Sequence, residues 1–165
     1  MQANLEVAIK AVSLNGLALQ YCSPELRNSK TVVSAALNQA AYALRNASDE
    51  MKANRQMVLQ AVSLDGKMLV HAHPSLREDD EVVLAAVQQN GAALSYASEE
   101  LRARGDLVRA AVENNGMALR YACPELRGST FTAKQSAQDV SISRRLIDSS
   151  TQAICRRCLR YLDGF

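Results

Sequence analysis

The chain has 165 residues, of which 48% are hydrophobic, 22% charged and 4% aromatic, a composition typical of a folded protein with small aliphatic core side chains. Its formal net charge of +2 is too small to indicate nucleic-acid binding by itself. The sequence has no apolar run of the roughly 18–20 residues that a membrane span needs, and its start, MQANLEVAIKAVSLNG, lacks the features of a signal peptide.

From residue 4 to residue 128 the sequence repeats itself with a period of 25 residues. One column of the repeat is always leucine, one always alanine, one always arginine or lysine, and one is usually glycine. These columns are Leu19/Leu44/Leu69/Leu94/Leu119, Ala11/Ala36/Ala61/Ala86/Ala111, Arg27/Lys52/Arg77/Arg102/Arg127 and Gly16/Ala41/Gly66/Gly91/Gly116. The sequence therefore predicts five tandem units, at residues 4–28, 29–53, 54–78, 79–103 and 104–128.

Each unit is predicted to be a helix pair followed by a short turn. In the fourth unit, Asp79 or Asp80 can cap the first helix. Asn90-Gly91 is expected to end it, because glycine enters the left-handed conformation without a Cβ penalty. A second helix is expected at about residues 92–97. Ser98 should then cap the turn SEELR.

A helical unit of this length cannot enclose its own apolar face, so neighbouring units must stack. The alanine column allows helices to approach closely, and the leucine column fills the gap between units. Replacing one of these leucines by alanine should cost roughly 2–5 kcal/mol of stability. The predicted fold is all-α: an α-solenoid of five 25-residue helical repeats, with a C-terminal tail that is partly helical or disordered.

The stretch DDEVVLAAVQQNGAALSYASEELR closely resembles the repeat of a family catalogued as domain of unknown function 4116. The elements V-V-x-A-A-V, N-G-x-A-L and Y-A-S-x-E-L-R occur together, and the resemblance extends over residues 4–128. It implies a fold of tandem helical repeats and no particular activity. The second unit departs from the pattern, with Ala40-Ala41 in place of Asn-Gly and Asn46 in place of tyrosine. A non-glycine residue in a left-handed slot is expected to cost about 1 kcal/mol, which makes this unit the weakest or differently bent.

The sequence changes character after Gly128. Residues 129–139, rich in Ser, Thr and Gln, are predicted to be a linker, and residues 140–165 a basic C-terminal tail. Residues 129–165 hold six Lys and Arg against three Asp, whereas residues 1–128 hold 13 basic residues against 14 acidic ones. The tail contains a short amphipathic segment that can cap the end of the solenoid; alternatively the tail is disordered or a non-native extension.

Cys155 and Cys158, in the sequence CRRC, are the residues with the most chemical potential. Two such thiols can bind zinc or form a redox couple, but zinc usually needs a second pair and a thioredoxin-like site needs a βαβ context. Their spacing also fits the apolar stripe of a last helix, which is the interpretation we favour. We therefore expect no metal and no cofactor. Four cysteines without an export signal indicate free thiols and a cytoplasmic location.

Two further patterns have simple structural interpretations. His71 and His73 lie two residues apart, which does not place them on one side of a helix, so shared metal binding is not expected. The arginine column could contact phosphates, but an acidic column two positions earlier would largely cancel its charge. That acidic column is Glu25/Glu50/Glu100/Glu125. No arrangement of catalytic residues is recognisable, so we expect no enzyme.

Two columns of the second helix vary from unit to unit while lying three residues apart, hence on one face. They are Leu17/Tyr42/Lys67/Ala92/Met117 and Gln20/Arg45/Val70/Ser95/Arg120. Because tyrosine and arginine are frequent at interface hot spots, the candidate partner-binding residues are Leu17, Gln20, Tyr42, Arg45, Met117 and Arg120. The sequence thus predicts a non-catalytic scaffold or adaptor that recognises a protein or peptide. The alternatives are a metal or redox module at Cys155 and Cys158, a nucleic-acid-binding solenoid, or a fragment of a longer array.

Overall fold

The computed structural model describes residues 2–128, and all of the regular secondary structure in this range is helical, which confirms the predicted all-α fold. The chain divides into two compact units, Met1–Ala122 and Cys123–Phe165. In the second unit the described part comprises Cys123 and helix α9 (Pro124–Gly128). The predicted linker at 129–139, the tail at 140–165 and the pair Cys155 and Cys158 lie outside the described residues.

Within residues 2–122 three kinds of element recur in a fixed order. The long helices are α1 (Gln2–Leu14), α3 (Lys30–Gln39), α5 (Arg55–Leu64), α6 (Asp80–Gln89) and α8 (Gly105–Asn114). After each comes a six-residue 3-10 helix: η1 (Gly16–Tyr21), η2 (Ala41–Asn46), η3 (Gly66–His71), η5 (Gly91–Tyr96) and η6 (Gly116–Tyr121). The units are joined by four-residue helices: α2 (Pro24–Arg27), α4 (Asp49–Lys52), η4 (Pro74–Arg77) and α7 (Glu99–Arg102).

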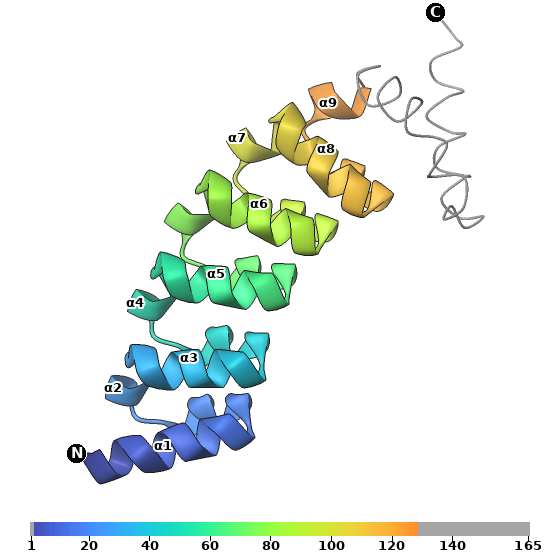
Figure 1. Cartoon of the computed structure of the whole chain (residues 1–165). Helices are drawn as coiled ribbons and strands as arrows, with labels where there is room; N and C mark the ends of the chain where they lie inside the picture. The colour runs from blue at the N-terminus through green and yellow to red at the C-terminus, as the bar shows by residue number, and fades with distance from the viewer. Residues whose placement is uncertain (1, 129–165) are drawn as a thin grey trace, which may run out of the picture. The chain divides into compact units, whose positions relative to one another are not determined.

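The long helices stack in chain order, with the short helices along one edge (Figure 1). The 3-10 helices form a second row, in which each contacts its neighbours and the long helices beside it. The core lies between successive units and consists of small aliphatic side chains, with Leu19, Leu44, Leu69 and Leu94 fully buried. These leucines are buried, as the repeat pattern predicts.

Backbone hydrogen bonds also connect one unit to the next. The carbonyl of Arg27 accepts from the amide of Ser48 at 3.1 Å, and the carbonyl of Lys52 accepts from the amide of His73 at 2.9 Å. The carbonyl of Arg77 accepts from the amide of Ser98 at 3.1 Å. These bonds tie each connecting turn to the next one along the array.

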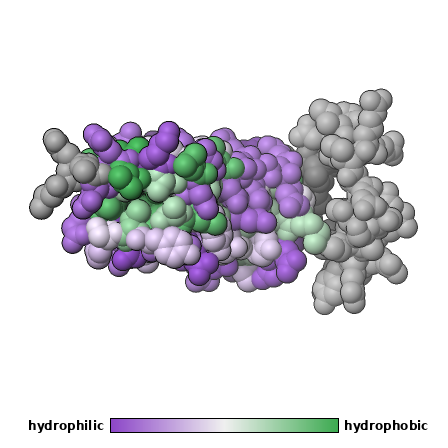
Figure 2. Space-filling view, turned by 90° about the horizontal axis from the view of Figure 1, so that it is seen from below, coloured by the Kyte–Doolittle hydropathy of each residue, from purple (hydrophilic) through white to green (hydrophobic). Residues whose placement is uncertain are grey.

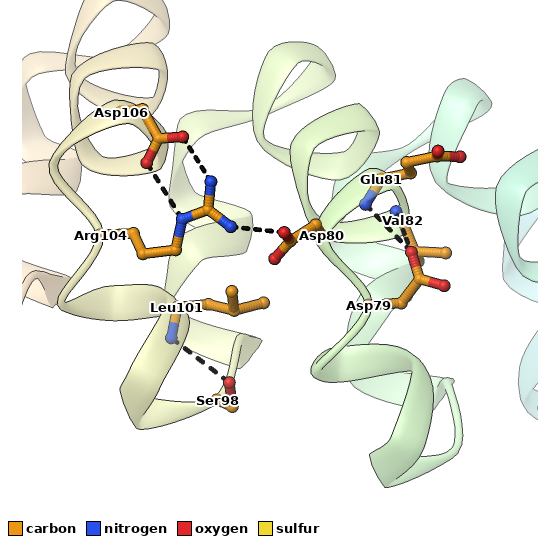
Figure 3. A network of polar contacts seen from close by, with 8 residues as sticks. All are labelled: Asp79, Asp80, Glu81, Val82, Ser98, Leu101, Arg104 and Asp106. Carbon is orange, nitrogen blue, oxygen red and sulfur yellow. Dashed lines mark hydrogen bonds and ion pairs between the residues drawn. The ribbon is translucent and has the colours of Figure 1, made fainter.

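The caps of the fourth unit follow the sequence closely. Asp79, rather than Asp80, is the N-cap of α6, and its carboxylate accepts from the amides of Glu81 at 3.0 Å and Val82 at 3.1 Å. The hydroxyl of Ser98 accepts from the amide of Leu101 at 3.4 Å and caps α7, as predicted (Figure 3). Each cap satisfies an amide that the first turn of a helix leaves without a backbone partner.

The predicted left-handed glycine is wrong, whereas the predicted second helix is present as a 3-10 helix. Among residues 2–128 neither a glycine nor any other residue has a positive φ. α6 ends because Asn90 is extended, with φ −150° and ψ 108°, and its side chain then accepts from the amide of Ala92 at 3.0 Å. The asparagine therefore starts η5, a 3-10 helix that begins at Gly91 itself rather than at residue 92.

The glycine column is required by the next unit instead. A Cβ on Gly66 would lie 2.2 Å from the carbonyl oxygen of Ala86, and one on Gly91 would lie 2.3 Å from that of Ala111. Ala41 occupies the same slot and is partly exposed, whereas Gly66 and Gly91 are buried. The predicted cost of a left-handed alanine at position 41 therefore does not arise. A side chain at this position instead limits how closely the following long helix can approach.

Candidate partner-binding surface

The six candidate residues lie on the row of 3-10 helices. A 3-10 helix has three residues per turn, so side chains three positions apart stand one above the other. Leu17 is 40%, Tyr42 45% and Met117 38% exposed, and the three polar members of the set, Gln20, Arg45 and Arg120, are also exposed. We call these six residues together with exposed Lys67 the outer strip.

The structure brings Tyr42, Arg45 and His71 into one cluster that crosses from η2 to η3. The guanidinium of Arg45 lies over the Tyr42 ring, 5.8 Å from its centroid, and Arg45 Nη1 donates to the Tyr42 hydroxyl at 3.5 Å. The His71 ring meets the Tyr42 ring edge to face, with centroids 5.5 Å apart. These contacts hold Tyr42 and Arg45 in one orientation while leaving both accessible. The two side chains therefore lose less conformational entropy when a partner binds.

His71 is half-buried in this cluster, and its surroundings oppose a charge on the ring. Burial lowers the pKa of His71, and the nearby cations Arg45, Lys52 and Arg77 lower it further. The ring is therefore neutral at pH 7. A neutral ring can pack against Tyr42 beside an arginine without electrostatic repulsion.

The outer strip is not continuous along the row. In η3 and η5 the corresponding residues Val70, Ala92 and Ser95 are partly buried, and the Ser95 hydroxyl donates to the Ala92 carbonyl at 2.8 Å. The structure thus places Tyr42 and Arg45 on η2 but Met117 and Arg120 on η6, with η3 and η5 between them. Arg120 stacks on Tyr121, 5.1 Å from the ring centroid.

The two kinds of short helix differ in their charged residues. The five 3-10 helices that follow the long helices carry Arg45, Lys67 and Arg120 and no aspartate or glutamate. Three of the four short connecting helices, α2, α4 and α7, carry acidic residues in their first turns, and all four carry a basic residue in the last turn. The outer strip therefore combines exposed apolar side chains with positive charge only.

A family model described as domain of unknown function (DUF4116) matches the chain at residues 4–52 and again at 54–102, which together exceed half of its length. The chain belongs to the DUF4116 family. Each matched segment spans two of the 25-residue units seen in the structure, so Leu17, Gln20, Tyr42 and Arg45 lie inside the matches while Met117 and Arg120 lie beyond them. No curated protein and no solved structure matches the chain.

An ion-pair network links the DUF4116 units, and the sequence reasoning missed it. Arg55 pairs with Asp79 at 2.9 Å and with Glu81, while Arg104 pairs with Asp106 at 2.6 Å and with Asp80 (Figure 3 shows the Arg104 pairs). Three of these pairs connect residues 24 or 26 positions apart, and the pair Arg104–Asp106 joins residues two positions apart. A column alignment would reveal the long-range pairs only if acidic residues were sought about one period before or after each arginine.

The network is structural rather than chemical. Hydrogen bonding to Arg55 lowers the pKa of Asp79, and hydrogen bonding to Arg104 lowers that of Asp106. Both carboxylates are thus held ionised against a neighbouring cation. Arg104, Asp80 and Leu84 line a hollow that is open to solvent. Groups paired in this way anchor the start of one long helix to its neighbour.

Within the arginine column, Arg77 hydrogen-bonds to carbonyls of its own unit. Arg77 donates from Nε to the Ala72 carbonyl at 3.1 Å and from Nη2 to the Val70 carbonyl at 2.7 Å. It therefore closes the end of η3, where carbonyls lack intrahelical partners. In Arg27 and Arg102 the Nε atom is buried and has no hydrogen-bond partner among the described residues.

The two histidines have separate structural roles in their DUF4116 unit. His71 packs on Tyr42, whereas His73 Nδ1 accepts from the amide of Ser75 at 3.3 Å and caps η4. Within residues 2–128 no three His, Cys, Asp or Glu side chains converge as a metal site would require. None of the helices in that range combines the length and apolar character of a membrane-spanning segment.

Proposed function

We propose that this DUF4116 chain is a non-catalytic repeat scaffold that binds another protein or peptide through the outer strip. The observation that supports this function is the combination of exposed Leu17, Tyr42 and Met117 with Arg45 and Arg120 on a row free of acidic residues. Tyrosine and arginine are over-represented at interface hot spots. The charge favours a partner segment that carries acidic residues among apolar ones.

The cluster on η2 is the part of the strip best prepared to bind. Tyr42 is held by His71 on one side and Arg45 on the other, so its ring is fixed before a partner arrives. An apolar side chain of the partner would lie against the exposed part of the ring, and a carboxylate would accept from the guanidinium of Arg45. The cytoplasm is the compartment we propose, supported by the free thiols of Cys22 and Cys123.

Replacing both Tyr42 and Arg45 by alanine tests this function. Proximity labelling and affinity capture from the native cell should lose the partner, while the far-ultraviolet circular dichroism stays that of the parent chain. The matched control replaces Leu84 and Arg109, which are exposed on the long helices and supply one apolar and one arginine side chain. This control should retain the partner.

The same experiment separates the alternatives. If the partner binds the Tyr42/Arg45 variant as well as the parent chain, the outer strip is not the binding surface. Recovery that disappears after nuclease treatment would instead identify a nucleic acid as the partner. High salt should weaken the interaction, because exposed charges are screened within a few ångströms at about 1 M ionic strength.

A further inference from the structure

The outer side of α1 exposes apolar residues whose counterparts in later units are buried. Val7 is 69% exposed, whereas the residues in its column are at most 4% exposed; these are Val32, Met57, Val82 and Leu107. Ala11 is exposed although the other alanines of its column are fully buried, and Tyr21 is 85% exposed. Figure 2 views the molecule from this end and shows hydrophobic surface within a hydrophilic border. We call the surface of Val7, Ala11 and Tyr21 the α1 face.

The last long helix and its 3-10 helix expose the complementary surface. Gly116 is exposed, and a Cβ added to it would meet nothing within 4 Å, unlike the corresponding glycines of earlier units. Val112 and Leu119 are half-buried, whereas their counterparts Val87 and Leu94 are fully buried. We call the surface of Val112, Gly116 and Leu119 the α8 face.

The internal junctions show how two such faces pack. The carbonyl of Ala111 lies against Gly91, and the same relation holds between Ala86 and Gly66. Applying this register to the α1 face and the α8 face places the Ala11 carbonyl of one molecule against Gly116 of another. The register of the His71–Tyr42 contact likewise places Tyr21 against Met117.

Charge supports the same register. At the junction between the second and third units, Gln60 Nε2 donates to Asn38 Oδ1 at 2.7 Å. The residues in these columns on the two free faces are Lys10 and Glu113, both exposed and opposite in charge. Stacking α1 on α8 would therefore pair an ammonium group with a carboxylate where the internal junction has an amide pair.

Leu14 on α1 occupies the repeat column of Asn114. The side-chain oxygen of Asn114 accepts a hydrogen bond from the amide of Gly91 at 2.8 Å, and a leucine cannot make this bond. Leu64 occupies the same column at the junction between the second and third units, and that junction forms nonetheless. Leucine in this position is therefore compatible with stacking.

We propose that copies of this chain associate head to tail, with the α1 face of one molecule stacked on the α8 face of the next in the register of the internal junctions. The contact joins two different surfaces, so each pair retains one free α1 face and one free α8 face. Association of this kind is open-ended, and the average size of the assemblies increases with protein concentration. Of the outer strip, only Met117 takes part in the register described here.

Sedimentation equilibrium of the full chain over a wide concentration range tests the proposal. The weight-average mass of the parent should rise above that of one chain as the concentration increases. Gly116→Val should weaken association by about tenfold or more, because its side chain would occupy the place of the Ala11 carbonyl, while its Cβ meets nothing within 4 Å in the single molecule. Lys10→Glu should also weaken it, by bringing two carboxylates together.

The double variant Lys10→Glu with Glu113→Lys restores the opposite charges and should recover the association. Lys67→Glu, an equal change of charge at an exposed residue of the outer strip, should associate like the parent. A parent chain that remains monomeric at every concentration would overturn the proposal. It would also be overturned if Gly116→Val associated like the parent, which is the result expected if two α1 faces were in contact. Failure of the charge swap to recover association would overturn it as well.

Discussion

The glycines that begin the 3-10 helices show how a single residue is governed by the neighbouring unit. The backbone at these positions is one that any residue can adopt, since φ is never positive among residues 2–128. The restriction comes from the alanine carbonyl of the following long helix. Glycine is thus selected by a contact some 20 residues away, and its importance should depend on whether a following unit is present.

Replacing Gly91 by alanine should therefore destabilise the protein, whereas Gly116→Ala should not. The new Cβ at position 91 would meet the Ala111 carbonyl at 2.3 Å, and relieving such overpacking costs about 1–3 kcal/mol. At position 116 the Cβ points into open space, and the lower backbone entropy of the unfolded chain should leave stability unchanged or slightly raised. Urea unfolding of both variants measures the difference, and equal losses would contradict the carbonyl contact.

His71 should make the stability of the array depend on pH. Its pKa is lowered in the folded state by burial and by Arg45, so the unfolded chain binds this proton at a higher pH than the folded one does. Stability is then fully present above the unfolded value of about 6.5 and is lost as the pH falls from there toward the lowered folded value. Protonation of the ring favours unfolding.

Urea unfolding between pH 8 and pH 5 checks this sign, with His71→Tyr as the test variant because tyrosine is the usual residue in the column. The variant should lose less stability on acidification than the parent. His73→Ser, which keeps a capping residue before η4, should retain the dependence of the parent. An identical pH profile for His71→Tyr and the parent would show that this ring is not the titrating group.

At the scale of the helices, the first turn of each long helix depends on whether its N-cap residue can accept a hydrogen bond. Asn54 and Asp79 both accept from two amides, at the start of α5 and α6 respectively. Arg104 cannot do so at the start of α8, and it pairs with Asp106 and Asp80 instead. The carboxylate of Asp79 also pairs with Arg55, so one side chain starts a helix and links it to the preceding unit.

Asp79→Ala should cost about 0.5–2 kcal/mol, because it removes the cap of α6. Asp79→Asn retains an acceptor for the amides of Glu81 and Val82 and loses only the charge opposite Arg55. Since this pair is partly exposed, the asparagine variant should lose less than about 1 kcal/mol, and its loss should shrink with added salt. Chemical unfolding at low and high salt distinguishes the two contributions. Equal losses for alanine and asparagine would mean that the cap contributes nothing.

The sequence allows the helices and their caps to be predicted because these depend on residues close together in the chain. The apolar spacing around Val82, Val83 and Ala86 predicts α6, and Ser98 predicts the start of α7. The 3-10 character of η5 could not be foreseen, since six residues are too few for a helical period to identify the helix type. The outer strip was identified from column variation, but its interruption in η3 and η5 depends on packing between units.

At the scale of residues 2–122, stability should decrease from the middle of the array toward its ends. In a repeat array each unit gains stability from its own helices and from its neighbours, so a terminal unit has one interface fewer. The structure has this pattern: Val62 and Leu69 in the third unit are fully buried, whereas Val112 and Leu119 in the fifth are half-buried, and Val7 is exposed. Full burial of such a side chain contributes about 1.5–3 kcal/mol, and a side chain that is only partly covered loses part of this contribution.

Amide hydrogen exchange should therefore be slowest in α5 and α6, and about tenfold or more faster in α1 and α8. Local opening at α1 or α8 exposes less of the surface that is buried in the folded protein, so it costs less free energy. The measurement requires dilute protein, since head-to-tail stacking would cover the α1 and α8 faces and slow their exchange. Repeating it at high concentration then reports on that stacking: protection should rise at α1 and α8 in the parent and stay unchanged in Gly116→Val. Uniform protection from α1 to α8 in dilute protein would mean that the units open together. It would contradict the expected decrease in stability toward the ends of the array.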